Sequence, residues 1–157
     1  MRQRLALLAL LATALPAHAQ SASPSVLPAV YQRLAADVLT EAVNTNTTAS
    51  TGSTTALARK LERRLLAAGY PARDIHIVGP DRKNQNLIVR LRGARSGRKA
   101  LLLAAHLDVV EANKADWTHD PFVLRRENGF FLGRGAEDDK SGVTVLMTNL
   151  QIGRAHV

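Results

Sequence analysis

Three consecutive acidic residues follow a Gly-Arg-Gly turn late in the chain. The stretch from residue 132 to residue 142 reads LGRGAEDDKSG, and its carboxylates are Glu137, Asp138 and Asp139. Because like charges repel, a tight turn that gathers them indicates a positive partner. One candidate is the start of a helix expected from Lys140, whose free N–H groups and dipole favour carboxylates. The other candidate is a divalent cation.

A histidine and an aspartate lie upstream inside an apolar run. Residues 100–110 read ALLLAAHLDVV, which is typical of a strand buried on both faces. Side chains alternate along a strand, so His106 and Asp108 share one face near its carboxyl end, where open α/β sheets bind ligands. A self-satisfied His–Asp hydrogen bond and a metal site both explain this pair. The acidic turn favours the metal, because imidazole and carboxylate are typical zinc ligands.

The elements that must position these residues follow from hydrophobic periodicity. Apolar spacing predicts one helix over 29–43, a second that Ser53 or Thr54 caps and Gly69 ends, and a third over 140–150. Short strands are expected over 74–78, 87–91 and 130–132. Helices followed by strands and another helix indicate an α/β fold, with a sheet covered by helices.

The first residues indicate export from the cytoplasm. MRQRLALLALLATALPAHAQ combines two arginines, a short apolar run and an Ala-His-Ala motif, as in a cleavable signal peptide. We expect residues 1–19 to be removed after Ala19, and residues 20–28 to form a Ser/Pro-rich linker. The protein would then be periplasmic or secreted, without a stable membrane span. An uncleaved anchor or a buried first helix stays open.

Composition excludes two classes of partner and ligand. The net charge is +8, from 21 Lys and Arg against 13 Asp and Glu. These basic residues are scattered and are not interleaved with aromatic residues, so we expect no nucleic-acid partner. The chain has no cysteine, which excludes disulfides and thiolate metal ligands.

The ordered set of motifs resembles a known enzyme family. In chain order it comprises HLDVV at 106–110, Trp117, DPF at 120–122, Gly129 and GRGAEDDKSG at 133–142. This set is similar to the co-catalytic dizinc metallopeptidases and amidohydrolases, which include glutamate carboxypeptidase, aminoacylase, carnosinase-type dipeptidase and succinyl-diaminopimelate desuccinylase. The resemblance covers roughly residues 45–150. It implies the phosphorylase/hydrolase-like catalytic domain of that family, a mixed sheet flanked by helices.

The resemblance also implies a role for each site residue. His106 would bind one zinc ion, Asp138 would bridge two, and Asp108 would act at the catalytic site by orienting the histidine. A cis peptide bond is expected between Asp138 and Asp139, with Asp139 structural. Arg134 and Lys140 either balance the acidic turn or are structural. Zn²⁺ is the implied metal, two ions per complete site, with Co²⁺ or Mn²⁺ as alternatives.

The same resemblance predicts that the catalytic centre is incomplete. The family's general-base glutamate follows the helix and a further strand, whereas no acidic residue follows Lys140 here. We therefore expect residues 29–150 to be the amino-terminal part of the catalytic domain, truncated before its lid or dimerisation domain and inactive alone. Residues 151–157 break the helical pattern and are interpreted as a non-native tail.

The implied reaction is zinc-dependent hydrolysis of an amide or peptide bond by the full-length protein. Its substrate would be a dipeptide or an N-acyl amino acid, as for a carboxypeptidase, dipeptidase or aminoacylase. A homodimer through the missing domain is an arrangement that the resemblance allows. A non-catalytic periplasmic binding module of the same fold and a mononuclear zinc deacetylase stay open as alternatives.

Overall fold

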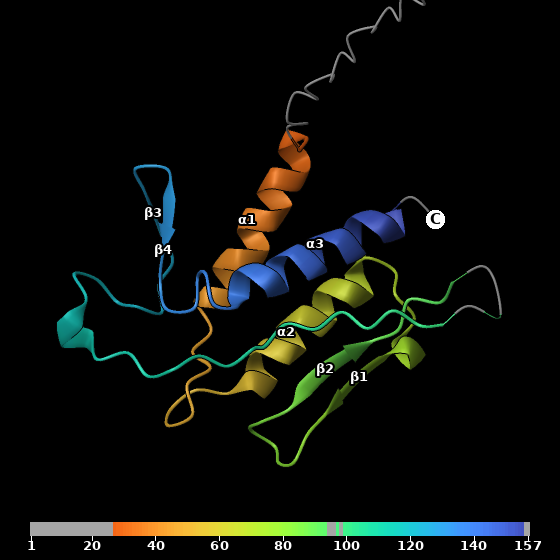
Figure 1. The fold of residues 1–157 in the computed structure, drawn as a ribbon, viewed down its shortest axis with the longest axis horizontal. Coiled ribbons are helices and arrows are strands. Elements are labelled where there is room, and N and C mark those ends of the chain that lie inside the picture. The colour runs from red at the N-terminus through yellow and green to blue at the C-terminus, as the bar shows by residue number, and fades with distance from the viewer. Residues whose placement is uncertain (1–26, 94–96, 98, 156–157) are drawn as a thin grey trace, which may run out of the picture.

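The computed structural model describes residues 27–93, 97 and 99–155. In it three helices pack beside an antiparallel hairpin, and a second hairpin lies near the other end of the molecule (Figure 1). The predicted signal peptide, residues 1–19, and residues 20–26 of the predicted linker lie outside the described residues.

The three helices agree with the helical periodicity of the sequence. They are α1 (Ala29–Val43), α2 (Thr54–Ala67) and α3 (Lys140–Ala155). The predicted cap of α2 is present, since Ser53 Oγ accepts the N–H of Ala56 at 3.2 Å. The helices share one core, whose buried helical members are Val38, Ala42, Leu57, Leu61, Leu65, Val143 and Met147.

The strands form two separate antiparallel hairpins. β1 (Ile75–Val78) pairs with β2 (Asn86–Val89), and β3 (Arg125–Glu127) pairs with β4 (Phe130–Leu132). The single-turn helices η1 (Ala72–Asp74) and η2 (Lys114–Asp116) precede the two hairpins. Hydrophobic periodicity gave no sign of β3, although Asn128 and Gly129, both at positive φ, form a typical hairpin turn. The α/β class is supported, but the described strands do not join into one mixed sheet.

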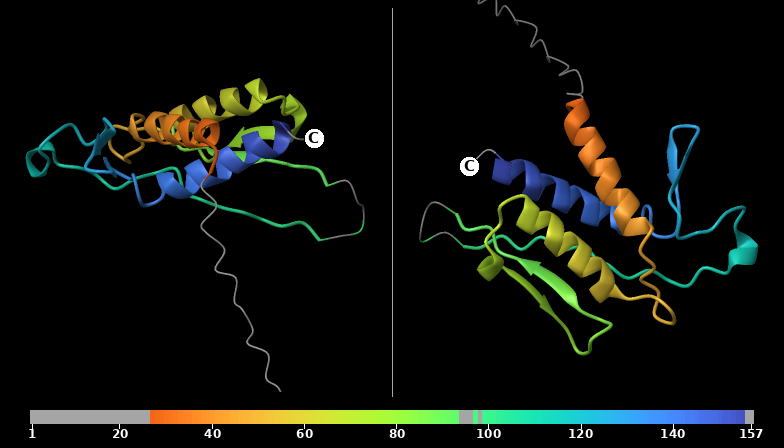
Figure 2. Two further views of the ribbon diagram at one scale, coloured as in Figure 1. Left: turned by 90° about the horizontal axis from the view of Figure 1, so that it is seen from above. Right: turned by 180° about the vertical axis from the view of Figure 1, so that it is seen from behind.

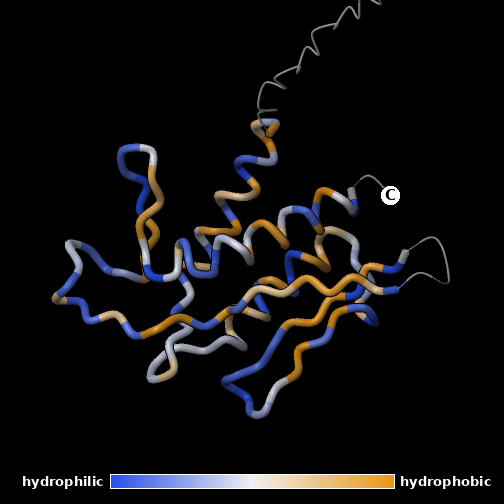
Figure 3. The backbone as a smooth tube through the Cα atoms, viewed as in Figure 1, coloured by the Kyte–Doolittle hydropathy of each residue, from blue (hydrophilic) through white to orange (hydrophobic). Residues whose placement is uncertain are grey.

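Residues 100–110 do not form the predicted strand buried on both faces. The segment is extended, yet no described strand pairs with it, and Leu101, Leu102 and Leu103 are 83%, 88% and 62% exposed. Figure 3 shows it as an apolar stretch, and in Figure 2 it lies on the side of the molecule away from α2. Only one face of its second half is covered, by way of Ala105, Leu107 and Val109. An apolar run is buried on both faces only where structure covers both of them.

The helix predicted over 140–150 continues to Ala155. Arg154, in the added part of this helix, contacts residues that follow α2. Its guanidinium lies over the Tyr70 ring, and its Nε donates to Gly69 O at 3.2 Å. Gly153 does not end the helix, since one glycine costs only about 1 kcal/mol relative to alanine. The non-native origin of residues 151–157 stays a prediction. Among the described residues, no helix has both the length and the apolar character for crossing a membrane.

The exposure of two leucines predicts a large loss of stability for one alanine substitution and almost no change for the other. Leu57→Ala, in the core of α2 with no exposed surface, should lower the free energy of unfolding by about 2–5 kcal/mol because it leaves a cavity. Leu102→Ala, at a site that is 88% exposed, should change it by less than about 0.5 kcal/mol. Denaturant unfolding measures both. A large loss for Leu102→Ala would show that the start of this segment is buried.

Candidate metal centre

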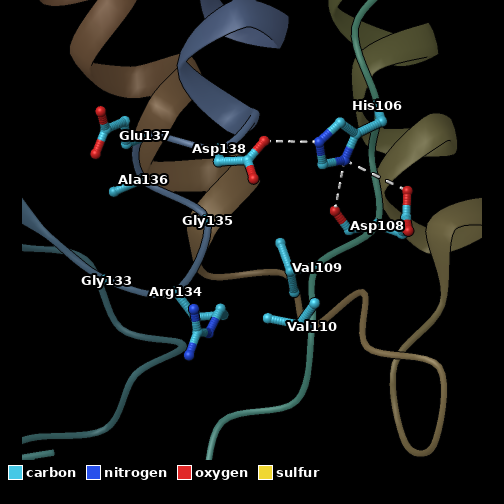
Figure 4. Close-up of a pocket in the computed structure, with 10 residues that line it drawn as sticks. All are labelled: His106, Asp108, Val109, Val110, Gly133, Arg134, Gly135, Ala136, Glu137 and Asp138. Atoms are coloured by element: carbon cyan, nitrogen blue, oxygen red, sulfur yellow. Dashed lines mark hydrogen bonds and ion pairs between the residues drawn. The ribbon is translucent and has the colours of Figure 1, made fainter.

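His106 and Asp138 meet at one hollow of the surface (Figure 4). His106 Nε2 lies 2.8 Å from Asp138 Oδ1, although the first residue belongs to the extended segment and the second to the acidic turn. The hollow has a volume of about 290 Å³, and the His106 and Asp138 side chains are 48% and 88% exposed. The pair is therefore accessible from solvent, and an imidazole nitrogen and a carboxylate oxygen point at each other across it.

Asp108 contacts the other nitrogen of the same ring. His106 Nδ1 lies 2.9 Å from the main-chain oxygen of Asp108 and 3.4 Å from its carboxylate Oδ1. The main-chain oxygen of Asp108 is thus nearer to Nδ1 than the Asp108 carboxylate, which the resemblance implied would orient the ring. A proton on Nδ1 that is donated to Asp108 leaves the lone pair of Nε2 free for a metal ion.

The two glycines of the Gly-Arg-Gly turn allow close approach to neighbouring segments. A Cβ on Gly133 would lie 2.6 Å from Val43 Cγ1, and one on Gly135 would lie 2.4 Å from Val109 Cγ1. Gly135 also has a φ of 77°, which side-chain-bearing residues rarely adopt. The turn can therefore lie against both α1 and the segment that carries His106.

Arg134, between the glycines, is held on the side of the η2 loop. Its backbone N–H donates to Pro121 O at 2.7 Å, and its guanidinium lies 5.4 Å from the centroid of the Trp117 ring. Such stacking of a cation on an aromatic face is favourable. These contacts favour a structural role for Arg134 over the alternative that it balances the charge of the acidic turn.

Asp138 and Asp139 diverge after the turn. The peptide bond between them is cis, as the resemblance implied. Asp138 lines the hollow, whereas Asp139 accepts the backbone N–H of His106 through Oδ2 at 3.2 Å. The resemblance implied a structural Asp139, and the backbone N–H of His106 is a partner that the sequence did not indicate.

Lys140, the first residue of α3, is completely buried. Its Nζ donates to the main-chain oxygen of Thr45 at 2.9 Å, and burial, with the nearby charge of Lys60, lowers the pKa of this ammonium to about 8. The contact with Thr45 favours a structural role for Lys140. Nothing in the sequence indicated this partner, because the acceptor is a main-chain oxygen 95 positions away from Lys140.

The contacts of His106 change its ionisation. The hydrogen bond to Asp138 is the largest cause that raises the pKa of the imidazole above its ordinary value of about 6.5, and burial opposes it. The main-chain oxygen and the charge of Asp108 raise it further. In the absence of metal the ring therefore keeps its second proton to a higher pH than a free imidazole.

The donor chemistry of His106 and Asp138 fits zinc, but two donors alone do not make a zinc site. Zinc takes imidazole nitrogen and carboxylate oxygen, but it needs at least three protein ligands. Within the described part of the chain, no group of three or more His, Asp or Glu side chains could hold a metal ion. In Figure 4 the carboxylate of Glu137 points away from the pair. His119 packs edge-on against Trp117, with the ring centroids 5.7 Å apart.

Comparison with known proteins supports the resemblance. Residues 102–156, which include His106 and Asp138, match the family described as Peptidase family M20/M25/M40. An uncharacterized carboxypeptidase of Schizosaccharomyces pombe is 38% identical over 42% of this chain and 12% of its own length. A succinyl-diaminopimelate desuccinylase of Methylibium petroleiphilum is 31% identical over 57% of this chain and 23% of its own length.

A third relative comes from the mouse. The N-fatty-acyl-amino acid synthase/hydrolase of Mus musculus is 36% identical over 40% of this chain and 12% of its own length. The aligned part thus spans less than a quarter of each of these three relatives.

The raised pKa of His106 can be measured in the metal-free chain. The NMR titration of its ring should have a midpoint above about 6.5, and Asp138→Asn should lower that midpoint because it removes the charged acceptor. Since the folded pKa is raised, the stability contributed by the pair is full below the unfolded pKa. It is lost as the pH rises through the folded pKa. Asp116→Asn, on η2, is the matched control and should leave the midpoint unchanged. An unchanged midpoint in Asp138→Asn would contradict the geometry.

Proposed function

Because the segment from residue 102 to residue 156 belongs to peptidase family M20/M25/M40, we propose that the whole protein is a zinc-dependent hydrolase of amide or peptide bonds. The observation that carries this proposal is the 2.8 Å approach of His106 Nε2 to Asp138 Oδ1. The names of the relatives, a carboxypeptidase, a desuccinylase and an N-fatty-acyl-amino acid synthase/hydrolase, support the class of reaction. Their shared chemistry favours a dipeptide or an N-acyl amino acid as substrate.

The residues of the chain prepare the site for the metal. Bound zinc would lower the pKa of a water molecule and polarise the scissile carbonyl. His106 offers Nε2 as a ligand once it has lost its second proton, and Asp108 holds the remaining proton on Nδ1. Asp138 presents one carboxylate oxygen to His106. In the complete site this carboxylate would be shared between two zinc ions, as the family resemblance implies.

The remaining parts of the reaction are proposed to come from outside the described residues. We assign the further ligands and the general base there, since two donors alone do not complete a zinc site. In this proposal residues 29–150 form the amino-terminal part of the catalytic domain, and residues 1–19 direct the protein to the periplasm or the outside of the cell. A homodimer would form through a domain beyond this part.

Replacing His106 tests the site directly. In the whole protein, His106→Ala should lower the zinc content and reduce hydrolysis of N-acyl amino acids and dipeptides by at least about 100-fold. Removing a residue that only hydrogen-bonds to a metal ligand already lowers metal affinity or activity by about 10- to 100-fold. Zinc per chain and the initial rate of hydrolysis are the measurements. His76→Ala is the matched control, because His76 is exposed on β1 and lies outside the hollow.

Each outcome separates this proposal from its alternatives. Wild-type activity in His106→Ala would remove the assigned site. A zinc-loaded wild-type protein that hydrolyses none of these substrates would favour a non-catalytic binding module. One zinc ion per active chain, rather than two, would favour a mononuclear deacetylase.

A further inference from the structure

Two consecutive residues contact the same histidine in different ways. Asp138 contacts the ring of His106 at 2.8 Å, and Asp139 accepts its backbone N–H at 3.2 Å. The direction of an imidazole depends on its side-chain torsions, but its place depends on the backbone that carries it. The contact with Asp139 therefore bears on where the ring can reach.

The backbone around His106 has little other support. The segment belongs to no described sheet, so it lacks the ladder of hydrogen bonds that holds a central strand. It is held instead by single contacts, such as that from the Val109 N–H to Thr47 O at 3.4 Å. Each such contact consequently has a large share in placing His106.

Gly142, in the first turn of α3, provides the space for the Asp139 carboxylate. A Cβ at this position would lie 2.1 Å from Asp139 Oδ1 and 3.0 Å from Oδ2, closer than non-bonded atoms approach. Glycine destabilises a helix interior relative to alanine, so its presence here has a local cost. The carboxylate occupies the volume that an alanine methyl group would fill.

We propose that Asp139 is a positioning residue for His106, and that its carboxylate, in the space left by Gly142, holds the His106 backbone so that the imidazole meets Asp138. This inference rests on the zinc site of the proposed function. It assigns Asp139 no contact with the metal. The acidic turn thus supplies one carboxylate for the ion and one for the chain that carries the other ligand.

Substitutions of Asp139 separate hydrogen bonding from charge. Asp139→Ala should weaken zinc binding by the whole protein about tenfold. This is the smaller of the losses in metal affinity that are typical when a residue hydrogen-bonded to a metal ligand is removed. Asp139→Asn should restore affinity to within about threefold, because its amide oxygen can accept the same N–H. Competition with a chromophoric chelator measures both affinities. If Asp139→Asn binds zinc as weakly as Asp139→Ala, the charge and not the hydrogen bond matters, and the proposal is wrong.

Two glycine substitutions in the same helix give a sharper comparison. Gly142→Ala should weaken zinc binding about tenfold, because the new methyl group displaces the Asp139 carboxylate. Gly153→Ala is the control, since nothing lies within 4 Å of the Cβ it would add. Alanine favours the helix at both positions, so a purely helical effect would leave zinc affinity unchanged in both variants. Wild-type affinity in Gly142→Ala would overturn the proposal.

A measurement without metal distinguishes this proposal from the proposed function. Hydrogen exchange of the His106 amide in the metal-free chain should be about tenfold faster in Asp139→Ala and Gly142→Ala, and near wild type in Asp139→Asn, since a lost hydrogen bond exposes the amide. If the wild-type protein binds no zinc but this pattern holds, the zinc site fails and the positioning contact stands. An unchanged exchange rate in Asp139→Ala would refute the positioning role.

Discussion

The arrangement of the site depends on the contact between Gly135 and Val109. These residues belong to segments that are distant in sequence, and a Cβ on Gly135 would approach Val109 Cγ1 to 2.4 Å. Val109 is the buried residue nearest to His106 on the extended segment. A side chain at position 135 would hold the turn away from this segment and separate Asp138 from the ring of His106.

A buried cation, the ammonium group of Lys140, stabilises the region next to this contact. Lys140 follows the acidic turn directly, and its ammonium reaches the carbonyl of Thr45, just beyond the carboxyl end of α1. Carbonyl groups at that end of a helix carry partial negative charge, which favours a cation. A charged group without a partner would be costly to bury. The bond thus joins the start of α3 to the end of α1 at a point next to the site.

Some features of the candidate site were predictable from residues that are neighbours in the sequence, and others were not. Alternation along an extended chain predicted that His106 and Asp108 share a face, and the ordered motifs indicated the family. The partners of Asp139 and Lys140 were not predictable in this way, because a hydrogen bond to a backbone group leaves no mark on the type of the partner residue. The Asn128–Gly129 turn was a usable signal for the second hairpin that the sequence analysis overlooked.

The sequence by itself determined the three helices, the two strands of the first hairpin, and the candidate donors His106 and Asp138. These follow from periodicity, capping residues and residue chemistry, which act over a few neighbouring positions. Only the tertiary structure decided that one face of the second half of the 100–110 segment is covered, that α3 continues to Ala155, and that Asp139 accepts the backbone N–H of His106. Burial and long-range contacts depend on which segments meet in space, and an apolar run has the same composition whether one of its faces is covered or both are.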